Sequence, residues 1–168
     1  MEQVRVPEGG SYTLTRLDGW PKFLAERLSR MEADIHEVNV LAGKIDQIGR
    51  ESIPWYEGVI SCVESERGGW ECSVKDLINA ADNLEYFGFL PWIVSDTDLG
   101  ESAVNGGSVG MLQGLPNEVL AFLDKEKVGA WLRETEKGVF TKEGYCYRVK
   151  EGWQEIYNGQ NLPEQETE

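Results

Sequence analysis

Few side chains in this sequence are of the types that carry out catalysis or hold a metal ion. The only histidine, His36, lies inside an apolar helical pattern, where a surface or interface role is more common than general-base catalysis. The three cysteines, Cys62, Cys72 and Cys146, are odd in number and show no CxxC spacing. We predict that they are reduced and buried thiols rather than disulfides or zinc ligands. The sequence therefore predicts no enzyme, no cofactor and no metal site.

Paired carboxylates are the remaining groups with chemical potential. Asp96 with Asp98, or Asp124 with Glu126, could hold a divalent cation, but the sequence lacks the glycine-turned loop of alternating oxygen ligands that calcium sites use. The glycine-rich stretch at residues 105–110 is not followed by Lys and Ser or Thr, so it does not predict a phosphate-binding loop. Because these residues predict neither a metal site nor a phosphate site, the remaining function is binding through the protein surface.

The charge of the chain constrains its partners. The sequence has 30 acidic and 16 basic residues, a formal net charge of −14. Residues 51–100 carry ten acidic and two basic side chains, so the negative charge is concentrated in the middle third. This balance disfavours nucleic acid and anionic membranes as direct partners. Plain solubility is the alternative explanation of the charge.

The composition indicates a folded protein. The chain has 168 residues, 40% of them hydrophobic, and six tryptophans, which is enough to bury a sizeable core. No run of about 18 apolar residues is present, so we expect no membrane span. The first residues lack the apolar core of a secretory signal, and we expect a cytoplasmic location.

The first half of the chain reads mostly as helix. Residues 11–17 alternate like a short strand, and apolar residues then recur at steps of three and four from Leu24 to Ile48. This stripe predicts a helix of about seven turns with a possible break near residues 34–36. Residues 55–64 favour a helix, with a strand as the alternative. Ser73 is predicted to cap a helix that ends at Leu84, with Asp76 completing a capping box.

The second half mixes both types of element. Residues 86–94 predict a buried strand interrupted by Pro91, and a helix is expected to begin at Asp96. Pro116 suits the first turn of a further helix with apolar residues from 119 to 132. Residues 139–147 predict two strands around a turn carrying Gly144, and residues 153–157 predict a last helical turn. From Asn158 we expect a disordered acidic tail.

These elements predict an α+β protein. We expect a helix-rich N-terminal half, a central helix plus a short strand, and a C-terminal helix packed on a β-hairpin. The predicted regions are residues 1–66, residues 67–157 and the tail at residues 158–168.

The second half of the chain resembles the C-terminal part of the ArdA-type antirestriction proteins of conjugative elements. Five pieces match in order, mainly over residues 74–149: residues 98–100 (DLG), 115–116 (LP), 122–129 (FLDKEKVG), 138–140 (GVF) and 144–145 (GY). None of these is a catalytic motif. Members of that family are acidic proteins that imitate DNA and occupy the DNA-binding surface of type I restriction-modification enzymes. The resemblance therefore implies an inhibitor with a protein partner.

A DNA mimic needs carboxylates at roughly the spacing of phosphates, and acids three or four residues apart on a helix lie about 5–6 Å apart. Under this interpretation the charge pattern would give fast, salt-sensitive association with a basic groove. The candidate phosphate imitators are Asp82, Glu85, Asp96, Asp98, Glu101, Glu118, Asp124, Glu126, Glu134 and Glu136.

Two other functions remain open. The apolar stripe from Leu24 to Ile48 could bind a protein partner, with exposed aromatic residues as anchors, which would make the protein an adaptor of a mobile element. Inhibition of a different defence enzyme would use the same physics as DNA mimicry on another target. The resemblance and the long stripe both leave a homodimer open.

Overall fold

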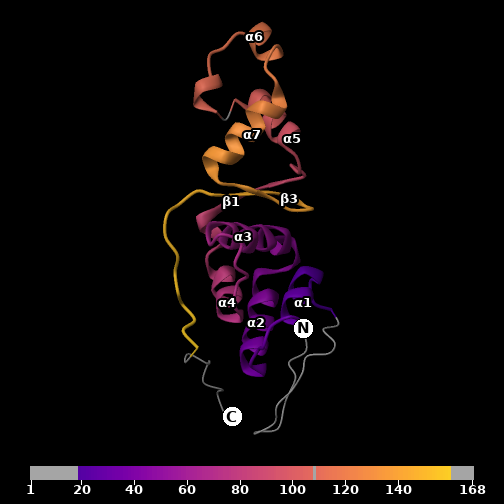
Figure 1. Ribbon diagram of the computed structural model, residues 1–168, viewed down its shortest axis with the longest axis vertical. Helices are drawn as coiled ribbons and strands as arrows, with labels where there is room; N and C mark the ends of the chain where they lie inside the picture. Colours follow the sequence, from indigo (N-terminus) through magenta and orange to yellow (C-terminus); the bar gives the residue numbers. More distant parts are fainter. Residues whose placement is uncertain (1–18, 108, 160–168) are drawn as a thin grey trace.

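Two apolar clusters on either side of a small sheet organise the protein. The structure, a computed structural model, describes residues 19–107 and 109–159, and in this part of the chain it has seven α-helices and one three-stranded sheet. Figure 1 shows them stacked along one long axis, with α1 to α4 at one end, the sheet in the middle and α5 to α7 at the other end. The predicted α+β class is confirmed. The strand predicted over residues 11–17 and the tail after residue 159 lie outside the described residues.

The apolar stripe from Leu24 to Ile48 forms two helices, α1 (Lys22–Leu28) and α2 (Ile35–Ile48). Asp34 has extended backbone angles, and its carboxylate accepts a hydrogen bond of 2.7 Å from the His36 N–H. An aspartate in this position satisfies one of the free N–H groups at a helix start. The predicted break near residues 34–36 is confirmed.

The next two helices begin at the predicted residue for α4 and two residues before it for α3. A 3₁₀ turn (Arg50–Ser52) leads into α3 (Ile53–Glu66), which confirms a helix rather than a strand. Helix α4 (Val74–Asp82) begins with the predicted capping box between Ser73 and Asp76. It ends two residues before the predicted limit, because Leu84–Tyr86 forms a 3₁₀ turn.

Helices α1 to α4 enclose the first core. Leu24, Leu28, Leu41 and Ile45 of the apolar stripe are buried in it together with residues of α3 and α4. Tyr56 is fully buried, and its hydroxyl donates a 2.6 Å hydrogen bond to the Leu77 carbonyl. These four residues of the stripe are therefore core, whereas Met31, Ile35 and Ile48 of the same stripe stay partly exposed. The predicted boundary between residues 66 and 67 runs through this core, since α4 packs on α2 and α3.

The sheet has the order β1-β3-β2, with β1 (Phe87–Pro91), β2 (Val139–Phe140) and β3 (Gly144–Arg148) all antiparallel. Strands form in both predicted regions. Pro91 ends β1 instead of interrupting it, only Phe87 of β1 is buried, and Gly144 belongs to β3 opposite Pro91 and not to the turn. Side chains of β3 alternate between the two faces. Cys146 accordingly lies in the first core and Tyr145 in the second, which it shares with Leu99, Ala103 and Leu132.

Beyond the sheet lie α5 (Asp96–Gly106), a 3₁₀ turn (Gly110–Leu112), α6 (Asn117–Ala121) and α7 (Lys125–Glu136). The single helix predicted after Pro116 is wrong. Asp124 takes an extended conformation and its carboxylate accepts the Lys127 N–H at 3.2 Å, so it starts α7 as a cap and ends the previous helix.

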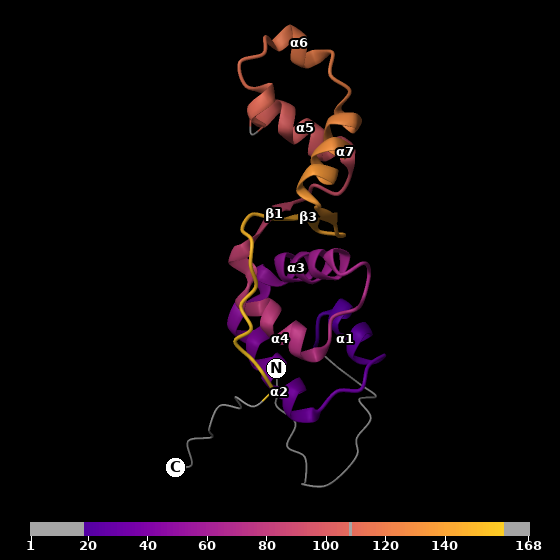
Figure 2. The same cartoon turned by 60° about the vertical axis from the view of Figure 1, so that its left-hand side comes forward.

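Residues 149–159 form no helix or strand, so the predicted helical turn at residues 153–157 is wrong. This segment runs along α4 in Figures 1 and 2. The backbone of Tyr157 bonds to Asn79 of α4 and that of Gln154 to Asn83, directly after α4, and these bonds replace those of a helix.

Candidate acidic binding surface

Helices α5 and α7, which carry most of the candidate carboxylates, cross at two glycines. A Cβ atom on Gly100 would overlap the Lys125 carbonyl oxygen, and one on Gly129 would overlap the Asp96 carbonyl oxygen. Each added atom would also lie 2.9 Å from the backbone nitrogen of the other glycine. Because neither residue has a side chain, the two backbones touch, and this contact fixes where the flanking carboxylates point.

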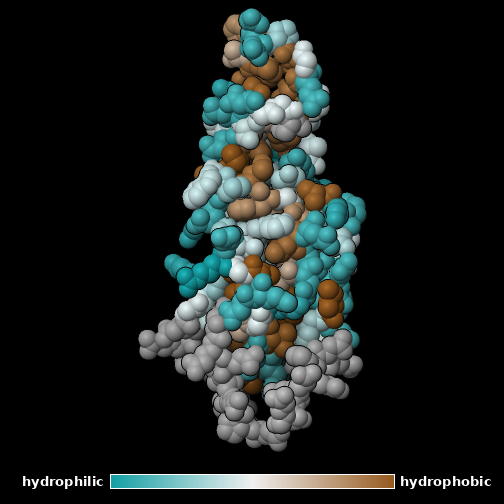
Figure 3. Space-filling view, turned by 180° about the vertical axis from the view of Figure 1, so that it is seen from behind, coloured by the Kyte–Doolittle hydropathy of each residue, from teal (hydrophilic) through white to brown (hydrophobic). Residues whose placement is uncertain are grey.

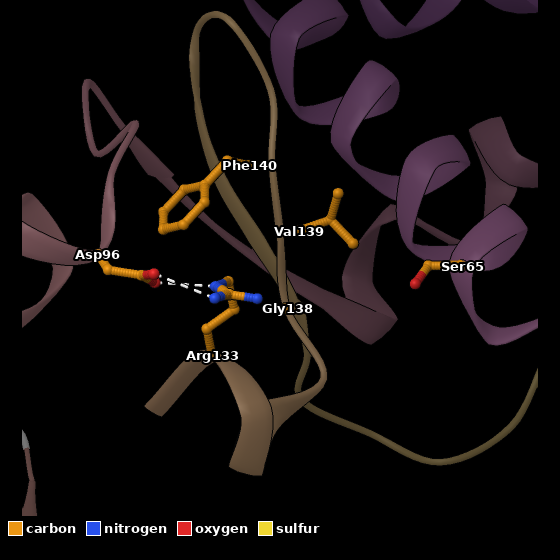
Figure 4. Close-up of a pocket in the computed structure, with 6 residues that line it drawn as sticks. All are labelled: Ser65, Asp96, Arg133, Gly138, Val139 and Phe140. Carbon is orange, nitrogen blue, oxygen red and sulfur yellow. Dashed lines mark hydrogen bonds and ion pairs between the residues drawn. The ribbon is translucent and has the colours of Figure 1, made fainter. Parts of the chain in front are cut away.

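An ion pair between Asp96 and Arg133 also joins α5 to α7, at the end of the crossing that is nearer to the sheet. The Arg133 guanidinium donates two hydrogen bonds to the Asp96 carboxylate, of 2.8 and 3.0 Å. Figure 4 shows the two side chains facing one another beside Phe140, at the edge of a cavity of about 420 Å³. The Arg133 hydrogen bonds lower the pKa of Asp96. Asp96 is thus tied to its own fold rather than free to imitate a phosphate.

Three further candidates on these helices have structural partners. Asp98 accepts the Ser95 hydroxyl at 2.7 Å and so completes the cap of α5. Asp124 caps α7, and the hydrogen bond from the Lys127 N–H lowers its pKa. Glu136 accepts the Tyr145 hydroxyl at 2.9 Å, and burial raises its pKa against the opposing effect of that bond.

The two candidates that precede the sheet in the chain form ion pairs. Asp82 is bound by Lys44 at 2.7 Å, and its second carboxylate oxygen is buried. Glu85 lies 3.3 Å from the Lys150 ammonium and stays well exposed. Asp82 therefore presents little charge to a partner, whereas Glu85 presents a partly neutralised one.

The last four candidates are fully available. Their carboxylates are exposed and, in the described part of the chain, form no hydrogen bond or ion pair; they belong to Glu101, Glu118, Glu126 and Glu134. No lysine or arginine occurs between Lys75 and Lys125, so α5 and α6 contain no basic side chain of their own. We call these four residues the free carboxylate set.

An exposed apolar surface at the same end was not predicted. Phe122 is 90% exposed and Met111 66% exposed, and Leu115 and Val119 are exposed with them. We call these four residues the apolar tip; Figure 3 shows hydrophobic side chains between hydrophilic ones at the α6 end. The signal that could have found it is the absence of any charge over residues 102–117, followed by a helix too short to bury a face.

The histidine and the three cysteines do not gather into one site. His36 is exposed at the start of α2, and the three cysteines are buried and free, as predicted for them. Burial raises the pKa of Cys72 to about 12, which keeps the thiol protonated at neutral pH. Within residues 19–107 and 109–159, no three His, Cys, Asp or Glu side chains gather as a metal site would require, and no helix has the length and apolarity to cross a bilayer.

Comparisons with protein-family models, with curated proteins and with solved structures found no match to this chain.

Proposed function

We propose that this protein is an antirestriction protein that imitates DNA and blocks the DNA-binding surface of a type I restriction-modification enzyme. The observation that carries the proposal is the free carboxylate set, four unpaired charges that project from α5, α6 and α7 at one end of an elongated molecule. The other six candidates bond to side chains or backbone groups of the fold, and Asp82, Glu85 and Asp96 among them pair with a lysine or arginine. Among the candidate carboxylates, the unpaired charge is therefore concentrated at this end.

The packing of α5, α7 and the hairpin supports the same proposal. The segments that resemble the antirestriction family meet in space: Gly100 contacts Gly129, and a Cβ on Gly138 would overlap the Tyr145 ring. Their residue types are therefore explained by close packing, and the carboxylates stand on the unit that they build. A rigid base is what a mimic needs, because its charges must hold the spacing of a phosphate backbone.

Inhibition would be competitive and would break no covalent bond. Double-stranded DNA carries about one charge per 1.7 Å of axis, and a protein that binds it presents lysines and arginines in a groove. The free carboxylate set would pair with those cations in the cytoplasm. Long-range attraction between the net −14 chain and a basic groove would speed encounter and weaken as salt screens it.

The decisive experiment measures DNA cleavage by a purified type I restriction-modification enzyme in the presence of this protein. Changing the free carboxylate set to glutamine (E101Q, E118Q, E126Q, E134Q) should raise the half-inhibitory concentration by roughly tenfold or more. A control variant removes the same charge from exposed glutamates elsewhere: E26Q, E32Q, E51Q and E151Q. It should inhibit within about twofold of the wild type. Equal potency of the two variants would exclude the mimicry proposal.

The apolar tip favours a second candidate function, that of an adaptor which binds a protein partner through apolar contacts. Such binding would survive high salt, whereas binding through the free carboxylate set would weaken strongly. A salt titration of partner binding from 50 mM to 500 mM NaCl therefore separates the two candidates.

A further inference from the structure

The C-terminal strap, residues 151–157, is attached to the rest of the protein in an unusual way. It has no helix or strand, and only Tyr157 is buried, at 5% exposure, while Trp153 is half-buried. Figures 1 and 2 show it lying along α4 at the end of the molecule opposite to α6. Few of its side chains therefore contribute to the core, and its position must come from other contacts.

Asn79 of α4 and Asn83, the residue directly after this helix, hold the backbone of the strap. The Asn83 side chain accepts the Gln154 N–H and donates to the Gln154 carbonyl, both at 2.8 Å. The Asn79 side chain makes the same pair of bonds to Tyr157, at 2.8 and 2.9 Å. Each amide thus binds one residue of extended chain as a neighbouring strand would, without reading its side chain.

The two amides are oriented by α4 itself. The Asn79 amide nitrogen also donates to the Lys75 carbonyl at 3.1 Å, and the Asn83 amide nitrogen donates to the Asn79 carbonyl at 2.8 Å. These bonds stay within one helix and do not involve the strap. The amide pairs would consequently keep their direction if the strap left, which is the pre-organisation expected of a binding groove.

Side-chain contacts add a sequence preference. The Tyr157 ring enters the first core, and its hydroxyl donates to the Glu37 carboxylate on α2 at 3.4 Å. Lys75 forms an ion pair with Glu155, two residues earlier in the strap. Ile156 between them is exposed. The surface therefore favours an acidic residue, any residue, and then a tyrosine.

We propose that the surface formed by α2 and α4 is a groove for an extended peptide of a partner protein with the pattern Glu-x-Tyr, and that the strap occupies it as a built-in competitor. A tethered segment acts at an effective concentration in the millimolar range, so a free peptide binds weakly until the strap is displaced. This groove lies away from the free carboxylate set and does not depend on it.

The test uses full-length protein in which the strap is weakened, by Tyr157→Ser or separately by Glu155→Arg. The probe is a fluorescein-labelled peptide with the sequence of residues 151–159, followed by fluorescence anisotropy. Both variants should bind the probe at least tenfold more tightly than the wild type. A probe with serine in place of the tyrosine should lose binding, whereas one with serine in place of the exposed isoleucine should keep it.

A second substitution identifies the groove. Adding Asn83→Leu to the Glu155→Arg variant removes one amide pair and should abolish probe binding while circular dichroism shows an unchanged helix content. Because Glu155 is exposed, its substitution leaves the core intact, so a folded Glu155→Arg protein that fails to bind the probe would overturn the proposal. A wild-type protein that forms dimers lost on Glu155→Arg would also overturn it, because the strap of a second copy would then be the natural occupant.

Discussion

Asp96 and Glu101 belong to the same helix and carry the same charge, yet only one of them can meet a partner. Asp96 points toward the crossing with α7, where Arg133 binds both of its oxygens, whereas Glu101 points to solvent. A carboxylate's role in this protein is set by the side chain opposite to it. The number of acidic residues alone therefore overstates the charge that is available for binding.

The ion pair between Asp96 and Arg133 predicts a pH-dependent stability. Since Arg133 lowers the pKa of Asp96, the pair contributes fully above the unfolded pKa of about 3.9 and is lost as the pH falls through the lower folded value. Asp96→Asn should reduce the free energy of unfolding at pH 7, and the difference from the wild type should shrink toward pH 3. Urea unfolding at both pH values measures it, and a difference that does not change with pH would contradict the assignment.

The crossing of α5 and α7 predicts a large effect from one methyl group. Gly100→Ala or Gly129→Ala would force the methyl into a backbone carbonyl, and we expect a loss of at least about 3 kcal/mol in the free energy of unfolding. Gly43→Ala is the matched control, because nothing lies within 4 Å of the added atom. It should stabilise α2 by up to about 1 kcal/mol. Thermal unfolding measures the melting temperatures of the three variants. Similar melting temperatures for all three would refute the close contact between α5 and α7.

At the scale of elements, local signals made the predictions that succeeded. The break before α2 and the start of α4 each follow from an aspartate or serine that binds a nearby N–H group. Asp124 carries the same signal, but the apolar residues on both sides of it form a periodic pattern that indicated one continuous helix. The strap was beyond prediction, because its conformation depends on Asn79 and Asn83, more than 70 residues away.

Contacts between residues far apart in the chain also explain why the sequence did not show which candidate carboxylates are paired. Their positions on helices follow from the sequence, but their pairing depends on contacts such as Asp82 with Lys44, which join two helices. Apolar periodicity does not reveal such pairs. It also does not distinguish the stripe of α2, which is buried, from the apolar residues around α6, which are exposed.

The capping box of α4 predicts a measurable contribution to stability. Ser73→Ala removes the hydroxyl that accepts the Asp76 N–H at 3.2 Å, and it should lower the free energy of unfolding by about 1 kcal/mol. Ser73→Asp keeps an acceptor at the helix start and should retain most of the stability. Chemical denaturation followed by circular dichroism compares the two variants, and an equal loss in both would show that the cap is not the cause.

For the molecule as a whole, charge and apolar surface meet at one end. The free carboxylate set and the apolar tip share the α5 to α7 region, while α1 to α4 bury their apolar residues. The apolar residues of α1 to α4 are thus mostly buried, whereas the α5 to α7 end exposes both charged and apolar side chains.

Substitution within the apolar tip should separate binding from folding. Phe122 is 90% exposed, so Phe122→Ser should change the free energy of unfolding by less than about 0.5 kcal/mol. If the tip contacts the partner, the same change should weaken partner binding several-fold in high salt. Leu132→Ser, in the second core, serves as the control that should unfold the α5 to α7 end. Unchanged partner affinity for Phe122→Ser would remove the tip from the interface.

Adjacent residues of β3, Tyr145 and Cys146, supply one side chain to each of the two cores. A slip of this strand by a single position against β1 would turn the phenol ring toward the helices of the first core and the small thiol toward the second. One mistake in pairing would therefore crowd one interior and leave a hole in the other at the same time. The correct register of the five residue pairs between β1 and β3 is therefore needed for the packing of both cores.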